Sequence, residues 1–415
     1  MEKLNENMNY GILIRINREA QNLNLKFLSE ISGVSLGHIS KIEREIETST
    51  QDMLSYLFEA LCIDLNTVII KMETIQDDFW NLYHQIAYFE SKDNVTNSLI
   101  SFNEKYKEFE SVERLLINFI YHLSYDIQLI KCEDYIHLLN IVSDYLEPSY
   151  RQLFYDCFGL YFKEKNNIEK AIYYLEKSLK IDYNKIVTLM VLYHIGMAYR
   201  KNNQLLKAYY SMSQAKVLFS SSNNFVRICM TDMVIANIHS TNGEYQEAIA
   251  LLNECLKNFN RIKISIFEIS KVYLTMIWIY ILNDDYQSAQ NVIEHLDDTI
   301  LSVLEKKDSF ILYKIILHIH FKEKTLATKL CKSLFTRYDQ NNLDHNFIMY
   351  YYYVINENKA KRMKYLEQCK SLINKSSCII DNRYLFKLWN KECSTDKQSA
   401  QFKDTLMNYI FKSFN

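Results

Sequence analysis

The chain has 415 residues, of which only 1 is Pro and 6 are Gly, where average usage of roughly 5% and 7% would give about 20 and about 29. Because β-hairpins and Pro-rich linkers draw on these residues, the shortage excludes a β-rich or collagen-like chain and favours helices joined by short polar turns. With 48 Lys and Arg against 50 Asp and Glu, a formal net charge of −2 excludes a generally basic nucleic-acid coat, so any DNA contact must come from a local patch.

The cysteines and the apolar runs indicate where the protein resides. Nine cysteines are scattered without a CxxC pair, a pattern typical of reduced core thiols in a cytosolic protein. The first ten residues lack the basic-then-apolar run of a signal peptide. The most apolar stretch, 272–282, has 11 residues, too few to span a bilayer. We therefore expect a cytoplasmic protein that makes no membrane contact.

The first seventy residues predict five short helices separated by turns of two to five residues. Apolar residues recur at helical spacing in each segment, and Gly33 and Ser35 are placed as the end of one helix and the N-cap of the next. The final stripe predicts only a short fifth helix. The five stripes are Ile12, Ile16, Ala20 and Leu23; Phe27, Leu28 and Ile31; Ile39, Ile42 and Ile46; Met53, Leu54, Leu57, Ala60 and Leu61; and Leu65, Val68 and Ile69.

The segment 27–43, FLSEISGVSLGHISKIE, carries the decisive spacing. A short helix ends at Gly33, and a second begins two residues later at Ser35. This is the layout of a helix-turn-helix, whose second helix enters the major groove of DNA. If only the Gly and the spacing were present, an ordinary helical hairpin within a larger array would be the better interpretation.

From Gly11 to Val68 the sequence resembles the DNA-binding domain of the XRE, or Cro and phage-repressor, family. The resemblance covers nearly the whole segment with its spacings. The matching residues are Ile14, Arg15, Arg18, Leu23, Leu28, Gly33, Val34, Ser35, Ile39, Ser40, Ile42, Glu43, Leu54, Ala60, Leu61 and Leu65.

This resemblance implies roles for individual residues. Arg18 and Glu43 match the family's structural salt bridge. The positions implied to meet DNA lie at the start of the second helix and on the recognition helix with its N-cap: Leu25, Lys26, Ser35, Leu36, Gly37, His38, Ser40 and Lys41. The chain departs from the family pattern at Glu45, where Gly is frequent, and at Thr48-Ser49, where Pro is frequent. The loop after the recognition helix is therefore expected to differ in shape.

The net positive charge of this segment is low for a DNA-binding surface. Residues 1–70 carry six Lys and Arg against ten Asp and Glu, whereas 10–44 carries five against three. The positive charge is concentrated where phosphates would lie. We expect a specific palindromic operator bound by a dimer, with weak non-specific binding, because each half-site supplies few counterion-releasing contacts.

From about residue 75 a self-similarity with a period near 38 predicts paired helices. Each unit has a small residue, an aromatic residue three later, and an Ala nine after the aromatic. The relative positions are those of the tetratricopeptide pattern, although the terminal Pro is absent and the spacing drifts from 37 to 41. The clearest units contain Gly159, Phe162, Ala171 and Leu175; Gly196, Tyr199, Ala208 and Met212; Ala236, His239, Ala248 and Leu252; and Tyr280, Ala289 and Ile293, with weaker copies around Ala327 and Arg362.

We therefore predict an all-α chain with two domains. Residues 1–72 form a five-helix helix-turn-helix domain of XRE type, and 73–415 form a right-handed superhelix of about eight degenerate tetratricopeptide-like helical pairs, which would bind peptide and dimerise. The alternative is a generic scaffold without a ligand. The repeat register predicts which side chains line the concave face: Asp156, Lys163, Tyr193, Met197, Arg200, Met233, Asn237, Lys271, Trp278, His320 and Tyr351.

Asn237 is singled out because an Asn inside a helix has poor propensity and needs a reason. It could clamp a peptide backbone with its paired donor and acceptor, or it could make an inter-helix hydrogen bond. Arg200, Lys163 and Lys271 could hold a carboxylate, or each could be a solvated surface charge.

A helix-turn-helix of this type followed by degenerate repeats resembles the RRNPP quorum-sensing regulators of Firmicutes, the Rgg, Rap, NprR, PlcR and PrgX group. The segment from Ile235 to Leu256 is especially similar to a PlcR-like repeat, in which the Asn matching Asn237 contacts the signalling peptide. The resemblance implies a homodimer that binds operator DNA and is switched by a short peptide on the concave face. The alternative is a repeat protein that binds another protein, such as a phosphorelay component, with DNA binding secondary.

No enzyme is predicted. The sequence has no GxxxxGK[ST], GxGxxG, HExxH or GxSxG motif and no spaced Cys/His set for a metal. We expect no cofactor and no metal site.

Overall fold

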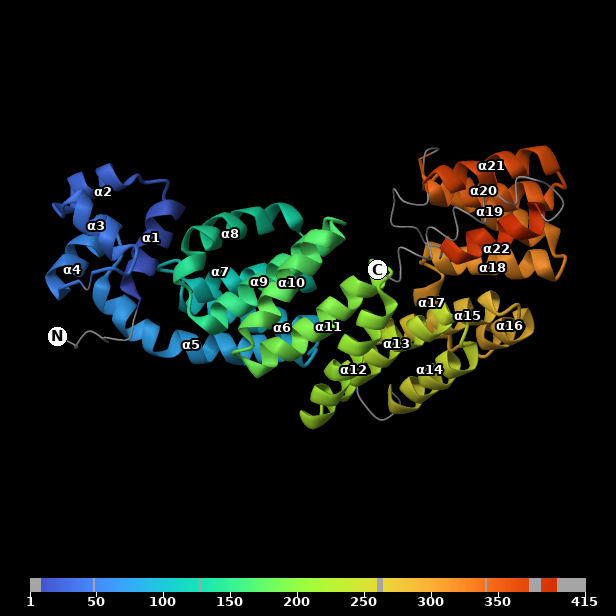
Figure 1. The fold of residues 1–415 in the computed structure, drawn as a ribbon, viewed down its shortest axis with the longest axis horizontal. Coiled ribbons are helices and arrows are strands. Elements are labelled where there is room, and N and C mark those ends of the chain that lie inside the picture. The colour runs from blue at the N-terminus through green and yellow to red at the C-terminus, as the bar shows by residue number, and fades with distance from the viewer. Residues whose placement is uncertain are drawn as a thin grey trace. The chain divides into compact units, whose positions relative to one another are not determined.

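The computed structural model of the chain describes residues 9–47, 49–126, 128–259, 264–339, 342–372 and 382–393, and all regular secondary structure in them is helical. The chain divides into two compact units. The first comprises Met1–Asn202 and Tyr210–Arg227, and the second comprises Asn203–Tyr209 and Ile228–Asn415. Figure 1 shows the helices of each unit, and each unit is described by itself.

The first unit contains the N-terminal helices and the first helical pairs. We call α1 to α4, with the start of α5 through Ile69, the head. Its helices are α1 (Tyr10–Ala20), α2 (Leu25–Ser32), α3 (Leu36–Ile42), α4 (Gln51–Ala60), α5 (Leu65–Ala87), α6 (Lys92–Lys105), α7 (Val112–Ser124), α8 (Leu129–Val142), the 3-10 helix η1 (Ser143–Tyr145), α9 (Pro148–Glu164), α10 (Ile168–Ile181), α11 (Lys185–Lys201) and the part of α12 (Leu205–Ser221) from Tyr210 onward.

The core of the head follows most of the predicted apolar stripes. Its fully buried side chains include Ile14, Leu28, Ile39, Leu57 and Val68. The stripes fail in α2 and after α3, where Phe27, Ile31 and Ile46 are exposed. The helix α3 ends at Ile42, so Ile46 lies beyond the helix that its spacing suggested.

The fifth helix differs from the prediction of a short one. Helix α5 has 23 residues and continues unbroken through the predicted domain boundary at 72/73. Its first turns bury Val68 and Ile69 in the head, and its later turns bury Phe79 and Tyr83 where it packs against α6, α7 and α11. The continuity has a simple cause, since no Gly or Pro interrupts 65–87.

The predicted small residues allow the helices of a pair to approach closely. A methyl group at Gly159 in α9 would lie 2.4 Å from Cγ of Leu175 in α10, and one at Gly196 in α11 would lie 2.8 Å from Cε of Met212 in α12. These are the partners that the repeat pattern assigns to each glycine. Real Cβ atoms do not tolerate such distances, so the side chain of the partner helix takes the place that a larger residue would need.

The second unit continues the array of helical pairs. The Ala of each repeat, Ala248, Ala289 and Ala327, is fully buried. The helices are α13 (Phe225–Asn242) from Ile228 onward, α14 (Tyr245–Phe259), α15 (Ile266–Leu282), α16 (Tyr286–Glu294), α17 (Asp298–Leu304), α18 (Asp308–His320), α19 (Lys324–Phe335), α20 (Leu343–Ile355), α21 (Lys359–Leu372) and α22 (Asn382–Cys393).

The described cysteines carry free thiols, and all but the exposed Cys62 are buried. Within the described ranges, no single helix has the length and hydropathy to cross a membrane. The pair α4 and α5 passes that test together, but the two helices bend by 99° at their break.

Two glycines in helices of the head offer a matched test of packing. A methyl group at Gly11 would lie 1.9 Å from the main-chain oxygen of Ile42, whereas nothing lies within 4 Å of one at Gly37. We expect Gly11→Ala to destabilise the head by about 2 kcal/mol or more through overpacking. Gly37→Ala should stabilise it by roughly 0.5–1 kcal/mol, because Ala loses less entropy in a helix. Hydrogen-exchange mass spectrometry on peptides from 9–60 measures both, and equal effects would contradict the close contact.

Candidate functional site

The turn between α2 and α3 is fixed by caps at both of its ends. Gly33 ends α2 in the left-handed region, with φ of 70°. The hydroxyl of Ser35 then accepts a hydrogen bond from the amide of His38 at 3.4 Å and begins α3. At the other end of α2 the side chain of Asn24 accepts from the amide of Phe27 at 2.8 Å. The predicted positions of Gly33 and Ser35 are thus the ones the structure uses.

A buried ion pair fixes α3 on α1. Nε and Nη2 of Arg18 donate to the two carboxylate oxygens of Glu43 at 2.6 and 2.8 Å, and Nη1 donates to the main-chain oxygen of Leu23 at 2.7 Å. Arg18 and Glu43 are 5% and 3% exposed. The bidentate geometry satisfies both carboxylate oxygens. This is the pair that the resemblance assigned as the structural salt bridge.

The implied DNA-contacting residues lie mostly on one exposed surface. Ser35, Leu36, Gly37, His38 and Lys41 are exposed, and Ser40 is half-buried. On α2, Lys26 is exposed and Leu25 is half-buried. Leu36 is 46% exposed, as are Phe27 and Ile31 of α2. The buried residues of α3, Ile39 and Ile42, point the other way, so α3 presents a whole face to solvent.

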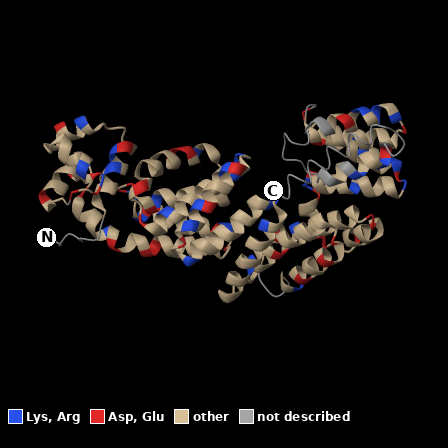
Figure 2. Cartoon of the chain, in the orientation of Figure 1, with Lys and Arg blue, Asp and Glu red and all other residues tan. Residues whose placement is uncertain are grey.

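The cations on this face are accompanied by carboxylates. Nζ of Lys41 lies 3.3 Å from Glu47, and Nζ of Lys26 lies 3.9 Å from Glu30. Figure 2 shows basic and acidic residues interspersed over α1 to α4. Both pairs are solvent-exposed, so each is worth little and can be exchanged for a phosphate. The low net positive charge that the sequence predicts for this segment is therefore also found on the folded surface.

Glu45 explains the departure from the family pattern. Its backbone adopts φ of 53°, the conformation in which Gly would carry no steric cost. Its carboxylate accepts a hydrogen bond from the amide of Ile12 at 3.0 Å. The amide belongs to the first turn of α1, where the main-chain N–H groups lack helical partners. The left-handed backbone at Glu45 is unfavourable for a residue with a side chain, but its carboxylate makes a hydrogen bond that a Gly could not make.

The sequence did not single out Asn17, which joins the head to the first repeats. Its side-chain oxygen accepts from the amide of Glu110 and its Nδ2 donates to the main-chain oxygen of Glu110, both at 2.8 Å. Asn17 is buried in the middle of α1. The signal that could have found it is the one applied to Asn237: an Asn inside a helix needs a reason.

Five of the predicted peptide-binding residues lie in the first unit, and the structure separates them by exposure. Arg200 is exposed, and Lys163 and Met197 are half-buried. Asp156 and Tyr193 are buried. Oδ1 of Asp156 lies 2.9 Å from Nδ1 of His194, so this carboxylate already has a partner inside the unit.

Asn237 and Lys271, two further predicted peptide-binding residues, lie in the second unit. Nδ2 of Asn237 donates to the main-chain oxygen of Met233 at 2.8 Å, a bond within its own helix rather than between helices. Both residues are half-buried. Nζ of Lys271 and Nζ of Lys307 lie 4.5 and 4.6 Å from the ring centroid of Phe267. Burial, followed by the charge of Lys271, lowers the pKa of the Lys307 ammonium, as expected where two cations crowd together.

Helix α22 covers two predicted groove residues of the second unit. Trp278 packs edge-on against Tyr384 of α22, with ring centroids 5.1 Å apart, and the hydroxyl of Tyr351 lies 2.9 Å from that of Tyr384. Nζ of Lys387 donates to the main-chain oxygen of Leu282 at 2.9 Å. Trp278 and Tyr351 are buried. His320 is exposed and stacks on Tyr286 at 4.1 Å.

The buried ion pair of the head predicts a large loss of stability when one partner is removed. Arg18→Ala leaves the carboxylate of Glu43 buried and unpaired, and we expect it to destabilise the head by about 3–5 kcal/mol. As a control, Lys26→Ala removes an exposed pair on α2 and should change the stability by less than about 0.5 kcal/mol. Hydrogen exchange of the α1–α4 amides measures both variants. Equal protection in the two would contradict a structural role for the pair.

Comparisons with known proteins agree on the fold. No protein-family model matches the sequence, and no curated protein sequence matches it. Solved structures do match. A Rap protein complexed with competence and sporulation factor aligns at 13% identity with a TM-score of 0.61, over 82% of this chain and 97% of that one. NprR in complex with its cognate peptide NprX aligns at 16% identity with a TM-score of 0.59, over 81% and 98%.

The apo form of the quorum sensor NprR from B. thuringiensis aligns at 16% identity with a TM-score of 0.56, over 77% of this chain and 99% of that one. At such identities the likeness concerns the fold alone. The prediction of an all-α chain is confirmed by the described helices, and the chain has a tetratricopeptide-like superhelical repeat fold of the kind seen in the Rap and NprR structures.

Proposed function

We propose that this chain is a transcription regulator that binds operator DNA as a homodimer through α2 and α3 and is switched by a short signalling peptide held by its repeats. The observation that carries the proposal is the exposed face of α3, with Leu36, His38 and Lys41 turned to solvent. A buried ion pair fixes that face on α1. The shared fold with peptide-bound Rap and NprR structures supports the peptide as the effector.

The residues on the face of α3 suit a major-groove contact. Lys41 and His38 can donate to phosphates or to guanine, and the apolar Leu36 can contact a thymine methyl group. Gly37 leaves open space beside it, which allows the helix backbone to approach the bases. Two such helices in a dimer would read half-sites about 34 Å apart.

Lys41→Ala tests the DNA contact. A selection from random duplexes with the purified full chain should first yield a palindromic site. We expect the variant to bind that site about tenfold more weakly, with a salt dependence reduced by roughly one ion for each protomer. Fluorescence anisotropy between 50 and 200 mM salt, a range over which such contacts are resolved, measures both quantities.

The control is Lys92→Ala, which removes an exposed cation at the start of α6 and should leave operator affinity unchanged. If the selection yields no preferred sequence, or if both variants weaken binding equally, α3 is not the reading helix.

The proposed peptide contacts are Asn237 and the cations near Phe267. The amide of Asn237 retains an oxygen acceptor and one N–H, because the described structure assigns its side chain only the bond to Met233. That is the donor and acceptor pair which a peptide backbone requires. Near Phe267 two lysines face one buried acid, Glu268, whose carboxylate accepts from Lys271 at 2.7 Å. The remaining positive charge favours a peptide carboxylate.

The head is connected to the first repeats in two places. Helix α5 runs from the head into the first repeats without a break, and Asn17 binds the main chain of Glu110. A peptide changes operator affinity only through different affinities for two conformations. We propose that these two connections pass such a change to α3.

Asn237→Ala tests the peptide contact. An array of synthetic heptapeptides should identify ligands of the full chain, and we expect the best of them to lose at least about tenfold in affinity in the variant. Asn253→Ala, on the exposed side of the paired helix α14, is the matched control. Fluorescence polarisation measures both variants. The same peptide should change operator affinity by about 5- to 150-fold, and an unchanged operator affinity would rule out switching.

A second candidate function is binding to another protein, such as a phosphorelay component. It is favoured by exposed apolar residues on α12: Tyr210 is 64% exposed and Val217 is 68% exposed, and a spacing of seven residues places them on one face. Exposed apolar clusters of this kind mark protein contacts. Changing both residues to Ser separates the candidates, since operator binding should survive while capture of the partner protein fails.

A further inference from the structure

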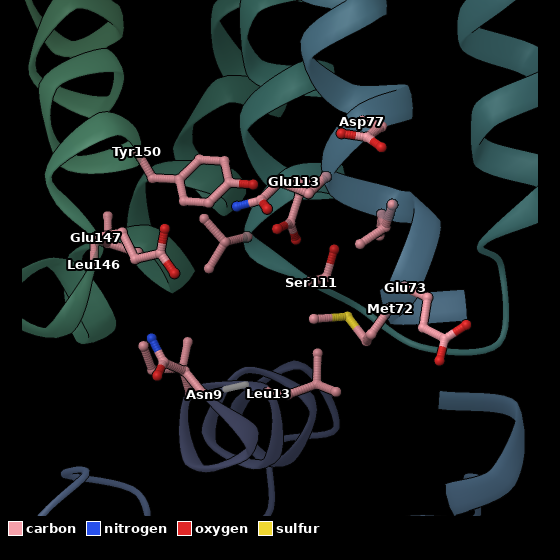
Figure 3. A pocket seen from close by; sticks show the side chains of 14 residues that line it. Asn9, Leu13, Met72, Glu73, Asp77, Ser111, Glu113, Leu146, Glu147 and Tyr150 are labelled. Atoms are coloured by element: carbon pink, nitrogen blue, oxygen red, sulfur yellow. The ribbon is translucent and has the colours of Figure 1, made fainter. Parts of the chain in front are cut away.

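A cavity of about 470 Å³ lies in the first unit, where α1 meets α5, α7 and the start of α9. Figure 3 shows its lining, which includes Ser111, Glu113 and Tyr150. The hydroxyl groups of Ser111 and Tyr150 donate to the carboxylate of Glu113. The side chain of Gln76 in turn donates to the hydroxyl of Tyr150. These polar groups are thus paired within the fold.

Two cysteines of the second unit face each other across the helix pair α13 and α14. Cys229 lies seven residues before Ala236, and Cys255 lies seven residues after Ala248. Because an α-helix has 3.6 residues per turn, a step of seven returns to the same face two turns away. Consecutive helices of a pair run in opposite directions, so the two steps lead to the same end of the pair. The two cysteines and the two alanines belong to one buried core cluster.

The structure brings the two thiols into contact. Sγ of Cys255 donates to the main-chain oxygen of Cys229 at 3.4 Å, and the two thiols are also hydrogen-bonded to each other. Both cysteines are free, and each is 1% exposed. Neighbouring sulfurs on two separate helices are the arrangement from which a disulfide can form.

The surroundings of Cys229 distinguish it from other buried cysteines of the chain. The hydrogen bond with Cys255 lowers the pKa of the Cys229 thiol, against the effect of burial. Burial alone acts in the opposite direction, since it raises the pKa of Cys132 to about 11 and that of Cys331 to about 12. The thiolate is the reactive form of a cysteine, so Cys229 is a better nucleophile than either of these two thiols.

The pair lies near the ends of its two helices. Cys229 is the fifth residue of α13, and Cys255 is the fifth residue from the end of α14. Helix ends open locally at a lower free energy than helix centres. A small oxidant can therefore reach both thiols without unfolding of the whole unit. In a reducing compartment a disulfide of this kind is transient and serves in redox sensing.

We propose that Cys229 and Cys255 are a redox modification site, in which a peroxide converts the two thiols into a reversible intrachain disulfide. The bond would join α13 to α14, the helix pair that carries Asn237. The inference rests on the positions of the two thiols and is independent of the proposed DNA and peptide functions.

The reaction consumes one hydrogen peroxide and releases two waters. The thiolate sulfur of Cys229 attacks one peroxide oxygen and the O–O bond breaks. The hydroxide that leaves takes up the proton lost by the thiol, and Cys229 becomes a sulfenic acid. The sulfur of Cys255 then attacks that of Cys229, the S–O bond breaks, and the second hydroxide takes up the thiol proton of Cys255. Each sulfur gives up one electron and the peroxide accepts both. A small thiol reductant reverses the bond by thiol–disulfide exchange.

Mass spectrometry of the full chain tests the pair, because trypsin releases both cysteines in one peptide. No Lys or Arg lies between Arg227 and Lys257, so the peptide 228–257 contains Cys229, Cys255 and no other cysteine. The reduced, folded chain is treated with hydrogen peroxide, and the remaining thiols are alkylated. We expect the peptide to take up no alkylating agent and to be lighter by about 2 Da, the mass of the two hydrogens lost. Dithiothreitol should restore both thiols.

Cys255→Ser removes the second thiol and should stop the reaction at the sulfenic acid of Cys229, which dimedone traps. Cys331→Ser, which changes another buried cysteine of the second unit, is the matched control and should leave the disulfide unchanged. In the unmodified sequence, we expect the peptide 228–257 to be oxidised at least about tenfold faster than Cys331, because burial raises the pKa of the Cys331 thiol.

The exposed Cys62 is an internal reference for the peroxide treatment. Complete oxidation of Cys62 with both thiols of 228–257 intact, equal rates for Cys229 and Cys331, or a disulfide from either thiol to a cysteine outside the pair would each overturn the proposal. The mass of the peptide 228–257 is measured on the chain without substitutions, so a variant that fails to fold does not remove the test. A negative result here does not bear on operator or peptide binding.

Discussion

One helix, α5, is shared between the head and the repeats, and the first unit depends on it. Val68 and Ile69 belong to the core around α4, while Phe79, Tyr83 and Ile86 of the same helix belong to the core of the first pairs. A continuous helix resists bending because each main-chain bond lost at a kink must be replaced. The head and the first repeats therefore share one continuous helical element.

The C-terminal end of α5 is fixed by a buried cation. Nε of Arg227 donates to the main-chain oxygen of Ala87 at 2.9 Å, and Nη2 donates to that of Ile86 at 3.1 Å. These are the carbonyl groups that a helix end leaves without partners, and a cation there also complements the helix dipole. The guanidinium lies over the rings of Phe89 and Tyr193. The predicted groove residue Tyr193 thus contributes to this anchor.

Local spacing predicted more of this structure than of its sites. Gly33, Ser35 and the repeat alanines lie where their patterns placed them, because capping and close helix contact are decided by neighbouring residues. The length of α5 was missed because the short stripe at 65–69 suggested a boundary that no Gly or Pro enforces. The contact of Trp278 with Tyr384 joins residues about 100 positions apart, for which a single sequence has no local signal. Helix α22, which covers Trp278 and Tyr351, could not be placed by repeat register at all, since it follows the last recognisable repeat.

The contact of Asn17 has a consequence for how related chains can vary. At Glu110, Asn17 binds only main-chain atoms, so this contact does not depend on the side chain at 110, whose carboxylate instead pairs with Arg114. The bond instead depends on the path of the backbone between α6 and α7. In a lineage that keeps this junction, insertions or deletions between 106 and 111 should be eliminated, because each would move the peptide group that Asn17 recognises.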